Sequence, residues 1–226
     1  MEFLDQSRQA VIWENDRRKL NYTSDRLIVL DEAEPDIDLK MSLPGLVNRR
    51  NAWEVAVAVE HILNKSLDEL IDHLNNFPGV SRRFEQISPM LYTDYAHTPP
   101  KIRGALQLAH EVAGDNVVVV YEGLHNTRQH FIKDELANLF DNVQQLYIVP
   151  SFLAREDKNL KLLTPADLLD LLSNESRAHA QVAQLNDDLA QAIASHLNQN
   201  DLVLALSAGS GNSLDDWLRQ NFSRVS

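Results

Sequence analysis

The sequence predicts an α/β protein in which a Rossmann-like, mostly parallel sheet with flanking helices follows a partial α/β domain of strands plus two helices. Three observations predict this class. Beyond Thr98, short apolar runs alternate with segments of helical periodicity, which is typical of βαβ units in a doubly wound sheet. Residues 116–121, NVVVVY, form a continuous apolar run of the kind seen in parallel strands covered on both faces. The first 45 residues contain only short strand-like segments without a covering helix, which indicates an incomplete sheet.

The N-terminal segments either alternate or run apolar over short lengths, and polar or proline clusters separate them. They are 9–15, 19–24, 26–32 and 37–43. Because four short strands without a helix make a poor domain, we expect them to be the tail of a larger sheet.

Two helices are predicted next. The first spans 48–64, with Asn48 as its N-cap after the Pro44-Gly45 turn. Its apolar residues recur at three- and four-residue spacing and are expected to form one buried stripe: Ala52, Val55, Ala56, Val59, Ile62 and Leu63. The second helix opens at Ser66, with Glu69 three residues on as a capping box. Residues 82–95 then read as two extended segments.

Strands and helices alternate over the rest of the chain. The expected strands are 116–121, 144–150, 179–185 and 201–207. The expected helices begin at Thr98, lie near 129–140, run from Thr164 to Leu172, span 187–197 and begin again at Ser213. We place the domain boundary near residue 90, so that 1–89 is an incomplete domain and 90–226 a complete α/β domain.

Composition narrows the possible partners. The 226 residues carry a formal net charge of -12, which argues against a nucleic-acid binder, because such affinity comes from Lys and Arg neutralising phosphates. The apolar runs are far shorter than the roughly 20 residues that span a bilayer. The chain has no cysteine, so disulfides and thiolate metal sites are excluded, and its start lacks the pattern of a signal peptide. We expect a cytoplasmic protein with no membrane partner.

The segment TDYAHTPPK (93–101) lies between an extended segment and a helix start, where loop side chains are held by rigid elements. Asp94 is suited to accept two hydrogen bonds from a ribose diol, and His97 to contact phosphate or transfer a proton. The helix N-terminus at Thr98 favours a bound anion. An Asp in a turn, a surface His and an ordinary cap would explain the same residues.

Two further segments carry polar side chains near element termini. Asn48 and Asn51 lie three residues apart at a helix start, where two amides can read the edge of an adenine; an N-cap and a surface amide are the alternative. Arg82 and Arg83 fall on a predicted strand, so one points to each side. An Arg there can stack on a base or pair with a phosphate, or form a solvent-exposed ion pair.

The loop after the first buried strand of the C-terminal domain, EGLHNTR (122–128), contains Glu122, His125, Asn126 and Arg128. Ligands of open α/β sheets bind at the carboxyl ends of strands, and Arg128 suits an anionic substrate group. The sequence SAGSGNS (207–213) follows the last buried strand and ends at the same edge. P-loop, HExxH, GxSxG and dinucleotide-fingerprint motifs are missing, which disfavours an unrelated hydrolase or reductase.

Four segments in order resemble the Mur ligase family, the ATP-dependent enzymes that add amino acids or peptides to UDP-N-acetylmuramate in peptidoglycan synthesis. LPGLVNRRNAWEVAVAVE is similar to the family's helix start, and FPGVSRRFE to its F-x-G-V-x-R-R-F-E. YTDYAHTP is similar to its D-D-Y-[AG]-H-[HT]-P, and YEGLHNTR to its substrate loop. The resemblance covers roughly residues 43–226 and is nearest to the muramate–alanine ligase and the ligase that recycles muramyl tripeptide.

The resemblance assigns roles residue by residue. It implies that Asn48 and Asn51 contact adenine, that Arg83 contacts the nucleotide, and that Asp94 binds the ribose. It implies that His97 lies beside the phosphates as a catalytic residue. It further implies that His125, Asn126 and Arg128 meet the incoming amino acid or peptide. The implied ligands are ATP, Mg²⁺ held mainly by residues outside this chain, a UDP-N-acetylmuramate-type substrate, and the amino acid or peptide.

The sequence also departs from the family. The N-terminal substrate domain and the P-loop part of the central domain are missing, and Val47 replaces a His. Residues 1–89 therefore resemble the end of the central domain and 90–226 the C-terminal domain. The chain is an excised fragment, one half of a split gene that meets its missing P-loop half, or a degenerate paralogue. We expect no ligase activity from the chain alone. A non-catalytic module that binds a ligand or partner protein is the competing hypothesis.

Overall fold

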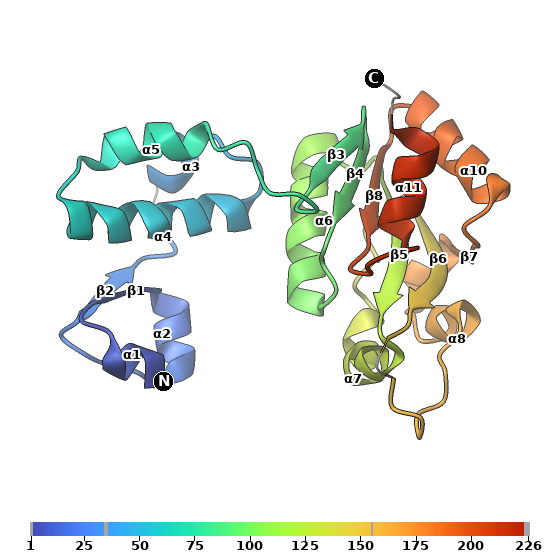
Figure 1. Cartoon of the computed structure of the whole chain (residues 1–226), viewed down its shortest axis with the longest axis horizontal. Helices are drawn as coiled ribbons and strands as arrows, with labels where there is room; N and C mark the ends of the chain where they lie inside the picture. The colour runs from blue at the N-terminus through green and yellow to red at the C-terminus, as the bar shows by residue number, and fades with distance from the viewer. Residues whose placement is uncertain (1, 34–35, 155, 224–226) are drawn as a thin grey trace. The chain divides into compact units, whose positions relative to one another are not determined.

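A computed structural model describes residues 2–33, 36–154 and 156–223, and the chain divides into two units between Pro78 and Gly79 (Figure 1). This division falls before the boundary near residue 90 that the sequence predicts. The reason is that β3 (Glu85–Ser88) pairs antiparallel with β4 (Leu91–Asp94) and so belongs to the second unit. Within the described residues, no helix has the length and apolar character that crossing a membrane requires.

The first unit contains a two-stranded parallel sheet, in which β1 (Ala10–Trp13) pairs with β2 (Leu27–Leu30). Its helices are α1 (Glu2–Gln6), α2 (Glu14–Leu20), α3 (Asp36–Lys40), α4 (Leu46–Leu63) and α5 (Leu67–Asn75). One apolar cluster joins the sheet to α3, α4 and α5, with Trp13 from β1 and Trp53 from α4 among its buried members.

Two of the four predicted N-terminal strands are wrong. Segment 19–24 overlaps the end of α2, whose first residue, Glu14, pairs with Arg17 and Arg18 along the helix. Segment 37–43 overlaps α3. There Ile37 and Met41 are buried one helical turn apart, while Leu39, which an alternating strand would bury with them, is 82% exposed.

The long helix α4 begins earlier than predicted. Its N-cap is Gly45, and Asn48 lies inside the first turn, where its side-chain amide donates a hydrogen bond to the Pro44 carbonyl at 2.9 Å. The predicted stripe is only partly correct. The helix buries Ala52, Trp53, Ala56 and Val57, whereas Val55, Ile62 and Leu63 are exposed. The Ser66 cap of α5 is confirmed, because its hydroxyl accepts from the Glu69 N–H.

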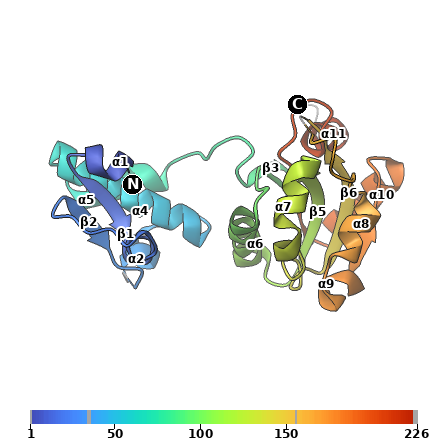
Figure 2. The ribbon, with the colours of Figure 1, turned by 90° about the horizontal axis from the view of Figure 1, so that it is seen from below.

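The second unit is a six-stranded sheet in the order β3-β4-β8-β5-β6-β7. Only the β3–β4 pair is antiparallel. The remaining strands are β5 (Val117–Leu124), β6 (Gln145–Phe152), β7 (Ala180–Val182) and β8 (Leu202–Leu206). The helices that surround the sheet in Figure 2 are α6 (Pro99–Ala113), α7 (Asn126–Leu136), α8 (Pro165–Asp170), α9 (Asn174–Ala178), α10 (Asp187–Asn198) and α11 (Leu214–Phe222).

Both faces of this sheet are covered, as the apolar run at 116–121 predicts. Val117 and Val119 of β5 pack in the cluster that contains residues of α6, α7 and α8, and Val118 and Val120 pack in the cluster with α10 and α11. Successive side chains of β5 point to opposite faces of the sheet, so this one strand contributes to both apolar clusters. The mostly parallel α/β architecture predicted for this part of the chain is confirmed.

The strand order creates a topological switch point. β8 lies between β4 and β5, and the chain leaves β5 for α7 on one face but leaves β8 for α11 on the other. Connections that diverge in this way open a crevice at the carboxyl ends of the strands, where α/β proteins bind ligands. Asp94, Glu122 and Ser207 mark the ends of the three strands at this edge.

Candidate functional site

Asp94 ends β4 and is buried, with 8% of its surface exposed. One carboxylate oxygen accepts the Phe84 N–H at 2.8 Å, and the other accepts the Ala96 N–H at 2.7 Å. Burial raises the pKa of Asp94, while these two hydrogen bonds and the nearby Arg83 and Lys101 charges act in the opposite direction. The carboxylate thus connects the segment around Phe84 to the segment around Ala96. The side chains predicted to contact the nucleotide lie in these two segments.

The two arginines of the S-R-R-F segment have different surroundings. They precede β3, so the prediction that they lie on a strand is wrong, and Arg82 has a φ of 57°. Arg82 donates to the Ser207 carbonyl at 2.8 Å and lies 3.6 Å from the Asp215 carboxylate. Arg83 is exposed and lies over the Tyr95 ring at 5.4 Å, so it is the arginine that a ligand can reach.

His97 is partly buried directly before α6. Its Nδ1 lies 2.8 Å from the Tyr95 carbonyl, which assigns the proton of the neutral ring to Nδ1 and leaves Nε2 as an acceptor. Burial lowers the pKa of His97, and the charges of Lys101, Arg128 and Arg83 lower it further, against the effect of the Tyr95 hydrogen bond. The neutral ring is therefore favoured until an anion neutralises these charges.

These four residues form what we call the cationic cluster: Arg83, His97, Lys101 and Arg128. In the part of the chain that the structure describes, Arg83, Lys101 and Arg128 have no ion-pair partner, and the Arg128 Nε is buried without a hydrogen bond. A buried guanidinium N–H without an acceptor is costly. In a chain with a net charge of -12, this concentration of unpaired cations indicates an anion site.

The predicted loop 122–128 is mostly regular structure, because β5 extends to Leu124 and α7 begins at Asn126, so Asn126 and Arg128 lie in the first turn of the helix. His125 adopts φ 55° and ψ 129°, a strained conformation for a residue with a side chain, and its Nδ1 lies 3.5 Å from Glu156. Asn126 is 2% exposed; its amide donates to the Lys161 carbonyl at 3.0 Å and its oxygen accepts the Leu163 N–H at 2.8 Å. Asn126 thus holds segment 161–163 through two hydrogen bonds. The guanidinium of Arg128, in contrast, is available to bind a ligand.

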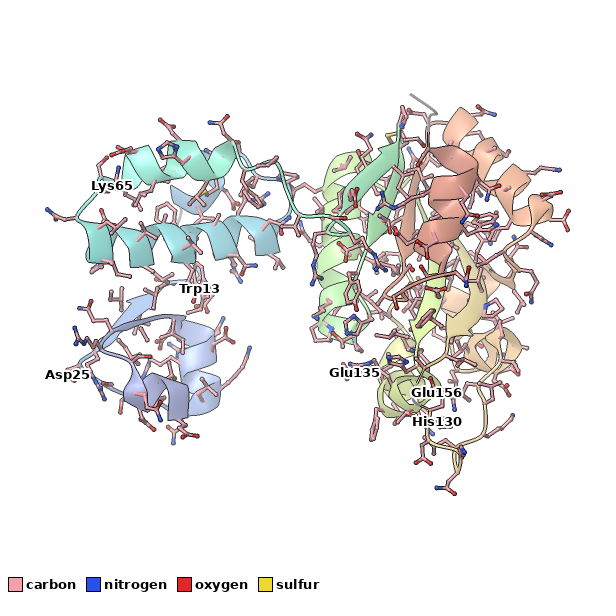
Figure 3. The ribbon with its side chains drawn as sticks, in the orientation of Figure 1. Trp13, Asp25, Lys65, His130, Glu135 and Glu156 are labelled. Atoms are coloured by element: carbon pink, nitrogen blue, oxygen red, sulfur yellow. The ribbon has the colours of Figure 1, made fainter. Side chains whose placement is uncertain are left out.

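Glu156 is a site residue that sequence reasoning missed. Its carboxylate accepts the N–H groups of Ala154 and Thr127 and lies beside His125. Figure 3 labels Glu156 and His130, whose Nε2 lies 2.8 Å from the Lys161 carbonyl, where this segment meets α7. No local pattern marks Glu156, because the two partners that connect it to the site, Thr127 and His125, lie some 30 residues earlier in the chain.

Glu122 and Gly123 shape the end of β5. The Glu122 carboxylate is 5% exposed, accepts the Ser207 hydroxyl at 2.7 Å and accepts the Leu214 N–H of α11 at 2.9 Å. A Cβ at position 123 would overlap the Ser151 hydroxyl and lie 2.8 Å from the Gln129 side chain, so glycine permits the close approach there.

Asn48 and Asn51 belong to the first unit. Both are exposed near the start of α4, and their three-residue spacing places them on one side of the helix. Their contact with adenine remains a prediction. Asp94, Arg83, His97 and the β5–α7 loop all lie in the second unit.

Comparisons with known proteins match most of this chain to one family. The model of a family described as "Mur ligase, glutamate ligase domain" matches residues 82–209. The UDP-N-acetylmuramate–L-alanine ligase of Brucella ovis is 31% identical over 185 residues, which are 79% of this chain and 39% of the relative. The Brucella anthropi enzyme of the same name is also 31% identical, over 182 residues. The chain therefore spans about two fifths of these relatives.

Solved structures share the fold at lower identity. The UDP-N-acetylmuramate–alanine ligase of Thermotoga maritima matches with a TM-score of 0.57 and 22% identity, over 81% of this chain and 39% of that one. The murein peptide ligase of Psychrobacter arcticus matches with a TM-score of 0.54 and 22% identity, over 82% and 39%. The Mycobacterium tuberculosis folylpolyglutamate synthase, solved with ADP and AMPPCP, matches with a TM-score of 0.52 and 18% identity, over 75% and 39%.

Proposed function

Because the chain belongs to the Mur ligase family, we propose that it forms part of an ATP-dependent ligase that joins an amino acid or peptide to UDP-N-acetylmuramate. In this proposal the second unit provides the ribose and phosphate contacts and the acceptor side of the site, and Asn48 and Asn51 provide adenine contacts. This ligation reaction would be a step of peptidoglycan synthesis or recycling in the cytoplasm.

The observation that carries this proposal is the cationic cluster at the carboxyl edge of the sheet. Ligation transfers the γ-phosphate of ATP to a carboxylate oxygen and releases ADP. The acceptor amine then attacks the acyl carbon, phosphate leaves, and the ammonium proton is lost. Each step has an anionic phosphate group, and the charges of Arg83, Lys101 and Arg128 would stabilise it. His97, with Nε2 free, is placed to hold or accept a proton there.

The residues that hold the predicted Mg²⁺ are expected mainly outside this chain. Among the described residues, no three His, Asp or Glu side chains are grouped to hold a metal ion. We propose that this chain provides nucleotide and acceptor contacts, and we expect no ligase activity from the chain alone. The P-loop part would come from a preceding segment or a second polypeptide.

Binding of ADP tests the proposal without requiring turnover. We expect calorimetry to detect ADP binding that weakens by about three- to tenfold in Arg83→Ala and in Arg128→Gln, since each removes one charge–phosphate contact. Arg103→Gln is the matched control, because Arg103 is an exposed α6 cation that pairs with Glu135. Equal losses in the control and the cluster variants would contradict the proposal.

Peptide binding in the absence of any ADP binding would instead favour the competing hypothesis of a non-catalytic module. Phosphate release by the purified chain with ATP and a UDP-N-acetylmuramyl substrate would contradict the prediction that it is inactive alone.

A further inference from the structure

The short peptide that carries Arg83 has a strained main chain. Its neighbours Arg82 and Phe84 have φ angles of 57° and 48°, in the left-handed region that residues with a side chain rarely adopt. Such conformations persist where the surrounding structure fixes them. The Arg82 N–H donates to the Glu85 carboxylate at 2.7 Å. The Phe84 N–H donates to Asp94 at 2.8 Å. The main chain on both sides of Arg83 is therefore held by carboxylates.

Tyr95 adds to the support on the Arg82 side. Its N–H donates to the Arg82 carbonyl at 2.8 Å, and the Arg82 guanidinium lies over its ring at 4.8 Å. Arg82 is thus fixed through its N–H, its carbonyl and its side chain. Because Arg83 follows directly, the conformation of Arg82 sets where Arg83 leaves the main chain.

Glu85 is in turn held by a residue of α11 that lies 134 positions later in the chain. Arg219 donates to both carboxylate oxygens of Glu85, at 2.7 Å and 3.2 Å, the two-pronged geometry in which a guanidinium binds a carboxylate strongly. This contact is the largest of the effects that lower the pKa of Glu85 to about 2. Glu85 is therefore ionised at neutral pH, and Arg219 fixes where its charge lies.

The contacts of Arg219 belong to a closed ring of charged groups. Its guanidinium also donates to Asp215, one helical turn earlier on α11, at 3.1 Å. Asp215 is 5% exposed, and its carboxylate lies 3.6 Å from the guanidinium of Arg82. The ring thus starts at the side chain of Arg82, passes through the two residues of α11 and Glu85, and returns to the Arg82 main chain. It connects α11 to the segment before β3.

We propose that Glu85 and Arg219 are positioning residues, which hold Arg82 in its left-handed conformation so that Arg83 directs its guanidinium at the bound nucleotide. This inference rests on the proposed function, in which Arg83 contacts ADP or ATP. Arg219 acts through Glu85 and does not itself touch the nucleotide. The alternative is an ion pair that only joins α11 to β3, which would add stability without affecting what Arg83 does.

A double-mutant cycle separates these two roles. Calorimetry of ADP binding to the whole chain should show a loss of about three- to tenfold in Arg219→Met, as in Arg83→Ala, because both remove the same contact. With Arg83→Ala already present, Arg219→Met should cause no further loss. With Arg128→Gln present, it should cause its full loss, because Arg128 comes from a different segment. Arg177→Met removes an exposed arginine that pairs with Asp170 and is the control.

Two conservative variants complete the cycle. Arg219→Lys keeps the charge but not the two-pronged contact, and should recover part of the affinity that Arg219→Met loses. Glu85→Gln keeps the side-chain size, removes the charge that Arg219 binds, and takes the place of Arg219→Met if that variant does not fold. Equal losses in the wild-type and Arg83→Ala backgrounds, or no loss in the wild type, would overturn the proposal.

Hydrogen exchange without nucleotide gives a separate readout. In Arg219→Met the Arg82 N–H should exchange about tenfold faster, while the Phe84 N–H, which Asp94 accepts, should change less. An unchanged rate at Arg82, or a faster rate with unchanged ADP binding, would overturn the positioning role and leave the proposed ligase. A faster rate in a protein whose wild type binds no ADP would remove the proposed nucleotide contacts and leave Arg219 in control of the conformation at Arg82.

Discussion

The Glu156 carboxylate accepts the main-chain N–H of Thr127 at 3.0 Å, so a residue of the segment after β6 caps the first turn of α7. His125, the N-cap by position, makes no side-chain cap. Arg128 lies on the turn that Glu156 secures. A carboxylate at a helix N-terminus also interacts favourably with the helix dipole.

We therefore expect Glu156→Gln to loosen the start of α7 and to destabilise the second unit by about 0.5–2 kcal/mol, the usual cost of losing an N-cap. Hydrogen exchange should become faster at Thr127 and Arg128, while β5 amides change less. Asp157→Asn, a neighbouring change at an exposed residue, is the control. Uniform acceleration across the sheet would contradict a local capping role.

Gly123→Ala should destabilise the second unit by about 1–3 kcal/mol, because the added methyl group would overlap the Ser151 hydroxyl and press on Gln129. Urea unfolding measures the loss. Adding Ser151→Ala to the same chain should recover part of it, since the nearest overlapping atom is then gone. Strictly additive effects of the two substitutions would show that the overlap is not the cause.

Asn126→Ala tests whether the side-chain amide stabilises the fold or contacts a ligand. Both ends of the Asn126 side chain are used by the main chain of 161–163, so we expect a stability loss of about 1–3 kcal/mol in urea unfolding. Binding of dipeptides should weaken less than in Arg128→Gln. If Asn126→Ala abolished peptide binding at unchanged stability, the amide would contact the ligand directly.

His97 makes the stability of the second unit depend on pH. The pKa of His97 is lowered in the folded chain, so the unfolded chain binds more protons as the pH falls through the ordinary histidine value of about 6.5. The free energy of unfolding is therefore not reduced by His97 above a pH of about 6.5, and it falls progressively as the pH drops below that value. His97→Gln should flatten this part of the pH profile of urea unfolding, and His73→Gln, an exposed imidazole of the first unit, is the control.

Phosphate should counteract this acid loss in the wild type, because a bound anion favours the protonated ring. An acid loss of the same size in wild type and His97→Gln would assign it to another group.

The sequence predicts the second unit well because its signals are local. The uninterrupted valines of β5 and the predicted helix starts at Thr164 and Ser213 each depend on a few neighbouring residues, and the structure contains all of them. The same reasoning fails at α3, since Ile37, Leu39 and Met41 fit an alternating strand as well as a helix that exposes Leu39. Only tertiary burial decides between those two periods.

For the candidate site, sequence reasoning identifies the residues but not their partners. Asp94, His97 and Arg128 come from segments with recognisable chemistry, and the pKa of His97 registers the charge of Arg128. The hydrogen bonds from the Thr127 N–H to Glu156 and from the Ser207 hydroxyl to Glu122 join residues 29 and 85 positions apart. No pattern within one segment encodes such pairs.

The position of β8 between β4 and β5 has a consequence for how the protein is made. The ribosome delivers β5, β6 and β7 before β8, so β4 and β5 have no shared partner until late in synthesis. Until then each presents an unpaired, apolar strand edge, the kind of surface on which nascent chains aggregate. Insertion of β8 closes a long chain loop in one event, which favours slow, all-or-none folding. Removing β8 would leave two separated halves of a sheet rather than a smaller one.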